Sequence, residues 1–170
     1  MSEGMMTSIL LPEHILAFDV ETTGLVPNYD FITSLCAVVM IDGEPTGEVF
    51  ERKVVPGAKV KISLEALEVQ GLDVRSTEGI EAVASQLRSL FPENAITAKE
   101  CMEQLTEWAI GGGYNALPVV AHKASFDMPF YSEKLEINRS VHSGNTLSPV
   151  WICTKTLACH VWPDKQPKNL

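Results

Sequence analysis

Residues 15–25 read ILAFDVETTGL, and this stretch decides the fold of the chain. The apolar residues that precede Asp19 predict a buried β-strand. Because side chains alternate between the two faces of a strand, Asp19 and Glu21 leave it on the same face. The residues that follow Glu21 predict an abrupt turn around Gly24. The stretch therefore predicts two neighbouring carboxylates at the end of a buried strand.

Two carboxylates on one strand face favour a bound cation. Burial of adjacent anions is costly unless a positive charge neutralises them. Oxygen ligands suit Mg²⁺ or Mn²⁺, so Asp19 and Glu21 are candidate metal ligands. The alternative is an ordinary Asp-x-Glu pair on a solvated strand face, which many proteins contain.

A second stretch, residues 117–131, repeats this design with the sequence LPVVAHKASFDMPFY. Its apolar residues 119–121 predict another buried strand, and a helical pattern follows. Pro129 is tolerated only in a first helical turn, which predicts a helix start near Asp127. Asp127 would then lie at a strand-to-helix junction. The alternative is that Asp127 only caps the helix and His122 is a loop histidine.

Taken together, the two stretches resemble the DEDD superfamily of 3′–5′ exonucleases, of the proofreading type. The first family motif, F-D-x-E-T-T-G-L, is matched by residues 18–25. The second motif, H-N-x-x-F-D, is matched by residues 122–127, except that Lys123 replaces the asparagine. Weaker similarity extends the resemblance over about residues 14–170, through residues 62–72, 156–158 and 167–170.

The family's third motif has no convincing match in the chain. That motif supplies a general-base His or Tyr and a fourth carboxylate on a late helix, whereas the sequence ends at Leu170. The segment 160–164 has a similar spacing, but Pro163 would break the helix there. We therefore expect an N-terminal extension at residues 1–13 and an exonuclease-like domain at residues 14–170 that lacks its C-terminal helices.

Composition favours one compact domain. The 170 residues are 45% hydrophobic, which argues against disorder, and no signal peptide or membrane span is apparent, so we expect a cytoplasmic protein. The net charge of −9 argues against tight, non-specific duplex binding, which needs a basic face. A basic cluster that includes Arg52 and Lys53 is interpreted as a solvated edge strand.

The remaining patterns predict an α/β fold. Residues 31–41 and 48–55 predict strands joined by a turn at 42–47, which gives an antiparallel meander with the first strand. Residues 97–110 predict a helix with a Thr97–Glu100 capping box. Further expectations are an added helix and loop at 76–94 and a last strand at 149–153. This order fits a ribonuclease-H-like mixed sheet with flanking helices, which the resemblance also implies.

The resemblance and the chemistry together imply a metal-dependent 3′–5′ exonuclease that hydrolyses single-stranded nucleic acid, expected to be DNA, to nucleoside 5′-monophosphates. Two Mg²⁺ or Mn²⁺ ions would be held by Asp19, Glu21 and Asp127. Partners would be 3′ ends of single-stranded DNA or RNA, and a DNA polymerase or replication and repair proteins. The residues expected to contact the terminal nucleotide are Thr22, Thr23, Gly24, Leu25, His122 and Phe126.

Two other classes of function stay open. Without the third motif, the chain could be a catalytically inactive exonuclease-like module that binds nucleic acid or protein. It could equally be the N-terminal fragment of a longer active exonuclease. Missing C-terminal helices would leave apolar side chains exposed, which predicts self-association through Trp151, Leu157, Val161 and Trp162.

Overall fold

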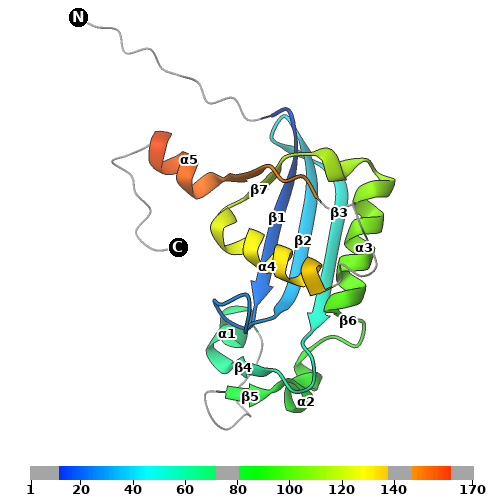
Figure 1. Ribbon diagram of the computed structural model, residues 1–170, viewed down its shortest axis with the longest axis vertical. Helices are drawn as coiled ribbons and strands as arrows, with labels where there is room; N and C mark the ends of the chain where they lie inside the picture. The colour runs from blue at the N-terminus through cyan, green and yellow to red at the C-terminus, as the bar shows by residue number, and fades with distance from the viewer. Residues whose placement is uncertain (1–11, 72–80, 138–146, 162–170) are drawn as a thin grey trace, which may run out of the picture.

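A six-stranded mixed sheet forms the centre of the protein. The computed structural model describes residues 12–71, 81–137 and 147–161. In this part of the chain the strand order is β6-β3-β2-β1-β7-β8, and a separate two-stranded sheet pairs β4 with β5 (Figure 1). In the same segments, no helix is both long and apolar enough to cross a membrane.

The first three strands form the expected antiparallel meander. They are β1 (His14–Thr22), β2 (Ile32–Ile41) and β3 (Glu44–Val55). The turn between β2 and β3 is shorter than the predicted span of residues 42–47. Asp42 and Gly43 adopt positive φ angles of 51° and 82°, so these two residues alone reverse the chain and β3 begins at Glu44.

Short parallel strands complete the sheet. β7 (Val119–Ala121) pairs in parallel with β1, and β8 (Trp151–Cys153) pairs in parallel with β7. β6 (Ile96–Thr97) pairs in parallel with β3 at the other edge. These pairings make the sheet mixed, and they bring the two acidic stretches of the sequence side by side.

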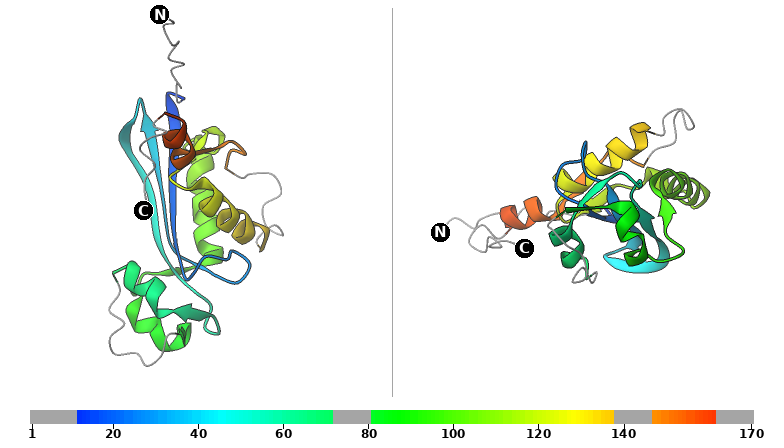
Figure 2. Two further views of the ribbon diagram at one scale, coloured as in Figure 1. Left: turned by 90° about the vertical axis from the view of Figure 1, so that its left-hand side faces the viewer. Right: turned by 90° about the horizontal axis from the view of Figure 1, so that it is seen from below.

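Two long helices cover one face of the sheet, as the edge-on view in Figure 2 shows. They are α3 (Ala98–Gly111) and α4 (Ala124–Ile137). The main core lies beneath them and contains Leu16, Phe18, Leu35, Leu105 and Phe130. The predicted capping box is present at the start of α3, where the Thr97 amide donates to Glu100 Oε2 at 2.8 Å.

Helix α4 begins three residues earlier than the sequence predicted. Ala124 is its first residue, and Pro129 lies inside the helix rather than in its first turn. The predicted start near Asp127 is therefore wrong. The chain turns into the helix at Lys123, whose carbonyl accepts from the Phe126 amide at 2.6 Å. A proline costs its helix one backbone hydrogen bond, and the packing of buried Phe130 and Tyr131 against the core offsets that loss.

Trp151 is partly buried and packs against the main core. Its ring lies edge-on to Phe18 at 5.3 Å and tilted against Tyr131 at 5.8 Å between centroids. Helix α5 (Thr154–Val161) follows β8, and Leu157 in this helix is half-buried. Trp151 is less exposed than predicted, because β8 pairs with β7 and places that ring against Phe18 of β1. Trp162 lies outside the described residues.

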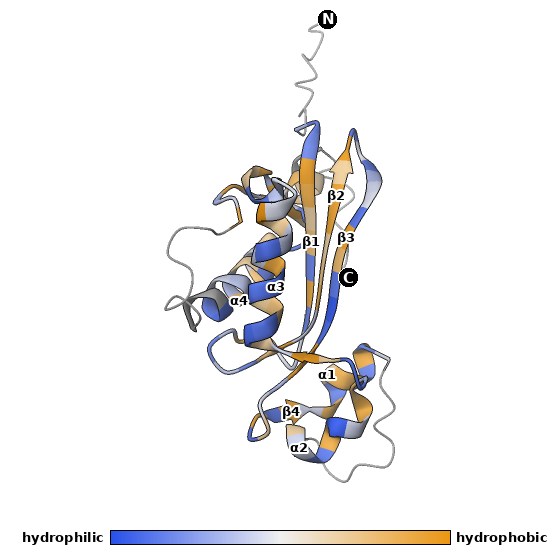
Figure 3. Cartoon of the chain, turned by 90° about the vertical axis from the view of Figure 1, so that its right-hand side faces the viewer, coloured by the Kyte–Doolittle hydropathy of each residue, from blue (hydrophilic) through white to orange (hydrophobic). Residues whose placement is uncertain are grey.

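A small lobe lies at one end of the sheet (Figures 1 and 3). It comprises β4 (Lys61–Ser63), α1 (Leu64–Val69), β5 (Glu81–Val83), α2 (Ala84–Leu87) and the 3₁₀ turn η1 (Arg88–Leu90). A second 3₁₀ turn, η2 (Tyr114–Ala116), follows α3 in the main body. The lobe has its own apolar cluster, which includes Ile62, Leu67, Leu87 and Phe91. The added helix expected within residues 76–94 is thus confirmed as α2.

The sheet face opposite α3 and α4 carries the acidic residues. Register pairs Asp19 with Cys36 and Glu21 with Ser34, so these side chains share that face. Figure 3 shows apolar residues along β1 and β2 and mainly polar residues along β3. The mixed sheet therefore presents one covered face and one face on which the carboxylates of β1 are displayed.

Candidate active site

Asp127 reaches the carboxylates of β1 from a distant part of the sequence. The backbone amide of Val20 donates to Asp127 Oδ1 at 3.2 Å, although the two residues are 107 positions apart. Val20 lies between Asp19 and Glu21, so the bond fixes the Asp127 side chain beside both. Asp127 is only 3% exposed, whereas Asp19 and Glu21 are exposed at the surface. The structure thus brings together the carboxylates of both motifs.

The pKa of each carboxyl group is raised by this arrangement. Burial is the largest cause for Asp127, and the neighbouring charges of Asp19 and Glu21 add to it, which raises the pKa of Asp127 to about 6. The Val20 amide acts in the opposite direction, because it stabilises the carboxylate. Asp19 and Glu21 are exposed in part only, and the partial burial of their carboxyl groups raises the pKa of both, with the charge of Asp19 adding to the rise at Glu21.

Two basic side chains moderate the negative charge. His122 attracts the Asp19 carboxylate and lowers its pKa, and Lys53 does the same for Glu21, in each case against the larger effect of burial. His122 is exposed, and its Nδ1 lies 3.2 Å from Thr154 Oγ1 at the start of α5. We call Asp19, Glu21 and Asp127 the acidic group. His122 therefore lies beside this group, and its contact with Thr154 at the start of α5 orients its ring.

The carboxylate oxygens of Asp19, Glu21 and Asp127 are of the type that Mg²⁺ and Mn²⁺ prefer, but these side chains lie apart from one another. Carboxylates whose pKa values are raised by burial and mutual repulsion gain most from a bound cation. Nevertheless, within residues 12–71, 81–137 and 147–161, no three His, Cys, Asp or Glu side chains converge closely enough to hold a metal ion. Metal binding would require these side chains to draw together.

An open pocket of about 440 Å³ adjoins the acidic group on the uncovered face of the sheet. Asp19, His122 and Thr154 form its polar part. Its apolar floor comes from alternate residues of β1 and β2, namely Ile15, Ala17, Val38 and Met40, together with Val120 of β7. The acidic group therefore lies at the edge of an accessible hollow.

The first-motif loop, residues 22–31, is held by its own side chains. Thr22 Oγ1 donates to the Gly24 carbonyl at 2.6 Å, and the Thr23 hydroxyl accepts from the Phe31 amide at 3.0 Å. Asp30 accepts from the Val26 amide at 2.8 Å and from Thr23 Oγ1 at 3.3 Å. Both threonines are buried, so their hydroxyl groups shape the loop rather than face the surface.

Leu25 is an exposed apolar side chain of this loop, as are Val26 and Tyr29. It is 79% exposed, although it is a large apolar residue that follows buried Thr23 and half-buried Gly24. A Cβ atom on Gly24 would come within 2.6 Å of the Asp30 carboxyl group, so a larger residue here would have to displace that carboxyl group from its bonds to Thr23 and Val26. The folding of the loop around Asp30 thus presents Leu25 outward.

Lys134 of α4 fastens the same loop to the main body. It is only 4% exposed, and its Nζ donates to the Pro27 carbonyl at 3.3 Å. The ammonium group lies 4.5 Å from the centre of the Phe31 ring, a cation–π contact. Burial lowers the pKa of Lys134, while the charges of Glu133 and Asp30 oppose that effect. No periodic pattern in the sequence pointed to this residue.

Gln70 is the other residue that sequence reasoning missed. From the end of α1, its Nε2 donates to the Thr22 carbonyl at 2.8 Å, and its Oε1 accepts from Thr33 Oγ1 at 2.6 Å. These bonds tie the small lobe to the strand that carries Asp19 and Glu21. The only signal in the sequence was the resemblance of residues 62–72 to the connecting segment of the family.

Phe126 packs within α4 and against the main core. Phe126 is half-buried, and its ring packs against Phe130 at 5.0 Å between centroids and against the main core. His160 lies in α5, and Asp164 lies outside the described residues. The absence of the third motif therefore stays a prediction.

The chain belongs to the exonuclease family described as RNase_T, whose profile matches residues 16–106, more than half of the 170 residues. The resemblance to the DEDD superfamily is thereby confirmed. The match begins within β1 and includes Asp19 and Glu21, and it ends within α3, before Asp127. Curated protein sequences provide no match.

Solved structures share the fold at low sequence identity. Cell-death related nuclease 4 (CRN-4) aligns with a TM-score of 0.64 and 14% identity, over 93% of this chain and 50% of that chain. The nuclease domain of 3′hExo, a DEDDh family member bound to rAMP, aligns at 0.62 and 13%, over 91% and 72%. A metal-free complex of E. coli exonuclease I with single-stranded DNA aligns at 0.60 and 12%, over 91% and 31%.

These similarities establish the fold, a ribonuclease-H-like mixed sheet with flanking helices, as the sequence predicted. This chain spans half the length of the first of these structures and about a third of the exonuclease I chain. The chain therefore has the family and the fold of these exonucleases.

Proposed function

We propose that the chain is a metal-dependent 3′–5′ exonuclease that removes nucleoside 5′-monophosphates from single-stranded DNA. The observation that carries the proposal is the bond from the Val20 amide to Asp127 Oδ1, which holds the Asp127 side chain against the strand residue between Asp19 and Glu21. The membership in an exonuclease family and the fold shared with nucleases support the reaction class. The complex of a structural neighbour with single-stranded DNA supports the substrate class.

Asp19, Glu21 and Asp127 would hold two Mg²⁺ or Mn²⁺ ions. Such ions supply an activated water and stabilise the leaving oxygen of a phosphodiester. Val20 keeps Asp127 oriented toward the strand through its amide, and Lys53 favours the charged form of Glu21. The carboxylates thereby supply the negative charge and the oxygen atoms that such ions require.

The first-motif loop would position the terminal nucleotide. Thr22, Thr23 and Asp30 fix the loop from within, and Leu25 presents an apolar surface on which the terminal base packs. His122 lies beside Asp19 and would contact the phosphate. Phe126 acts through packing of α4 rather than through direct contact with the nucleotide. A polymerase partner and a cytoplasmic location stay predictions.

A nuclease assay with a matched pair of variants tests this function. Single-stranded DNA labelled at its 5′ end should shorten progressively from the 3′ end in Mg²⁺ or Mn²⁺, and EDTA should stop the reaction. Asp127→Asn should abolish this activity, because it removes one anionic ligand and keeps the shape. Asp42→Asn makes the same change in the exposed β2–β3 turn, where asparagine tolerates the positive φ, and it should retain full activity.

One observation favours a second function, a nucleic-acid-binding module without catalysis. The carboxylates of the described residues do not form a closed metal site. In that case the wild-type chain would bind single-stranded DNA and leave it intact in both metals. Equal activity of wild type and Asp127→Asn would likewise remove the acidic group from the mechanism.

A further inference from the structure

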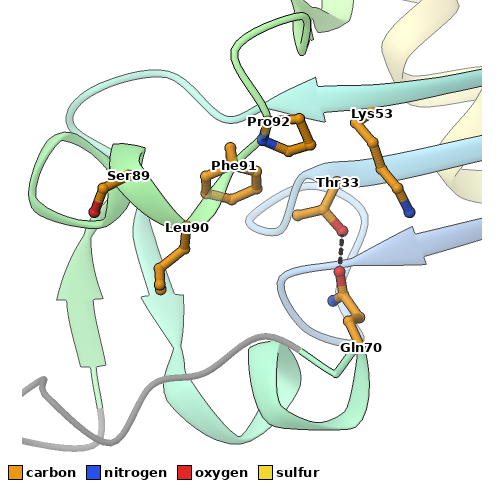
Figure 4. A pocket seen from close by; sticks show the side chains of 7 residues that line it. All are labelled: Thr33, Lys53, Gln70, Ser89, Leu90, Phe91 and Pro92. Atoms are coloured by element: carbon orange, nitrogen blue, oxygen red, sulfur yellow. Dashed lines mark hydrogen bonds between the residues drawn. The ribbon is translucent and has the colours of Figure 1, made fainter.

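A second pocket, of about 300 Å³, lies between the sheet and the small lobe (Figure 4). We call it the Lys53 pocket, and its lining residues are Thr33, Lys53, Gln70, Ser89, Leu90, Phe91 and Pro92. Its size is at the lower end of the range for small-molecule sites. No residue of this pocket belongs to the acidic group, so its purpose needs a separate explanation.

One wall of the pocket is polar and lies close to the acidic group. Register pairs Glu21 with Ser34 and Ser34 with Lys53 across three neighbouring strands. Strand spacing places Lys53 roughly 10 Å from Glu21 on the same face. Lys53 Nζ donates to Ser34 Oγ at 3.2 Å, and it forms no ion pair with any described residue. An ammonium group has two further protons to donate, which suits an anionic ligand.

The opposite wall is apolar and firmly held. It consists of Leu90, Phe91 and Pro92, which Figure 4 shows across the pocket from Lys53. Phe91 is buried in the apolar cluster of the small lobe, and Leu90 packs against that cluster. Arg88 Nη1 donates to the carbonyls of Phe91 and Pro92 at 3.4 and 3.2 Å. This wall is therefore shaped before any ligand arrives.

Gln70 connects the pocket with the first-motif loop. It lines the pocket together with Thr33, and its Nε2 also donates to the Thr22 carbonyl, next to Glu21. Gln70 therefore lies at the border between the first-motif loop and the Lys53 pocket. The Lys53 ammonium group faces an apolar wall close to the acidic group. A nucleotide of a single strand has both matching parts, a phosphate for the cation and a base for the apolar wall.

We propose that the Lys53 pocket binds the nucleotide on the 5′ side of the terminal one. Its phosphate contacts the Lys53 ammonium group, and its base packs against Leu90 and Pro92. The proposal rests on the proposed function, because it assumes that a single strand reaches the acidic group. In a chain of net charge −9, a local cation of this kind gives the backbone of the strand an attractive contact.

A binding experiment tests the pocket separately from catalysis. The probe is a fluorescein-labelled single-stranded oligodeoxynucleotide, and its anisotropy is measured in Ca²⁺ with wild type and variants. Ser89→Asp puts a negative charge into the pocket and should weaken binding roughly tenfold through charge repulsion. Ser85→Asp makes the same change on exposed α2, outside the pocket, and should bind like wild type.

Salt dependence identifies the phosphate contact. Lys53→Gln should reduce the slope of log Kd against log salt by about 0.7, the value for one phosphate of a single strand. Lys59→Gln removes an exposed lysine outside the pocket and should leave the slope unchanged. Equal slopes for the two variants, or equal affinity of Ser89→Asp and Ser85→Asp, would overturn the proposal.

The other outcomes separate the two proposals. A wild-type chain that binds the strand with these variant effects, but never cleaves it, would support the pocket and refute the exonuclease. Cleavage with no effect of Ser89→Asp or Lys53→Gln would support the exonuclease and refute the pocket. A pocket that takes a free nucleotide would instead show these effects with thymidine 5′-monophosphate and not with the strand, and this result also overturns the proposal. Failure of wild type to bind any strand refutes both.

Discussion

Replacement of Asp127 by asparagine should stabilise the metal-free protein at neutral pH. Asp127 is buried, and the charges of Asp19 and Glu21 raise its pKa further, from an ordinary value of 3.8 to about 6. The carboxylate form is therefore disfavoured in the folded state. Asparagine has the same shape, carries no charge, and its side-chain oxygen can still accept the hydrogen bond from Val20.

The magnitude follows from the pKa. Since one pKa unit corresponds to ~1.4 kcal/mol, a rise from 3.8 to about 6 sets an upper bound of ~3 kcal/mol. Between these pH values the folded state binds more protons than the unfolded state, so the free energy of unfolding falls as pH rises. The stabilisation that protonated Asp127 provides is complete below pH 3.8 and is lost as pH rises through about 6.

Urea unfolding in EDTA at pH 7 and near pH 4 measures the effect. At pH 7, Asp127→Asn should raise the free energy of unfolding by ~1–3 kcal/mol, which is a rise of roughly 3–10 °C in Tm. Near pH 4 most of this gain should vanish. Asp42→Asn serves as the control at an exposed site and should match wild type at both pH values. If Asp127→Asn is no more stable than wild type at pH 7, the buried charge of Asp127 does not lower the free energy of unfolding.

The remaining predictions concern metal binding and the first-motif loop. Mg²⁺ at a hundredfold excess over its Kd should stabilise wild type by ~2.7 kcal/mol in a thermal melt. Asp19→Ala should lose most of this gain. An equal response of both proteins to Mg²⁺ would show that Asp19 is not a metal ligand. Gly24→Ala should lower the free energy of unfolding by roughly 1–3 kcal/mol, because its methyl group would meet the Asp30 carboxyl group at 2.6 Å. Unchanged urea unfolding would show that the loop rearranges without cost. Leu25→Ala should raise KM for single-stranded DNA roughly tenfold by removing a base contact with no change in Tm, because this side chain is exposed; an unchanged KM would place the terminal base elsewhere.

Features that depend on neighbouring residues were predictable from the sequence. Alternation along β1 placed Asp19 and Glu21 on one face, because successive side chains of a strand always point to opposite sides. The Thr97–Glu100 capping box fixed the start of α3 through bonds that span three residues. The antiparallel meander followed from apolar runs that are separated by one short turn.

Local boundaries were less predictable where geometry competes with packing. The turn at Asp42 and Gly43 uses two positive φ angles, and the sequence alone suggested a longer turn because residues 44–47 also favour irregular structure. Pro129 indicated a helix start near Asp127 from local sterics. Tertiary packing of α4 on the core overrode that preference and placed the start at Ala124.

The identity of the first carboxylate pair, the family and the fold class were determined by the sequence itself, because they rest on short motifs and on the periods of strand and helix. Only the tertiary structure decided which distant residues meet. The bond between Val20 and Asp127, the hold of Lys134 on the loop and the link from Gln70 to Thr22 each join segments far apart in the chain. Such contacts depend on how the sheet pairs and how the helices pack on it, and no local pattern encodes that arrangement.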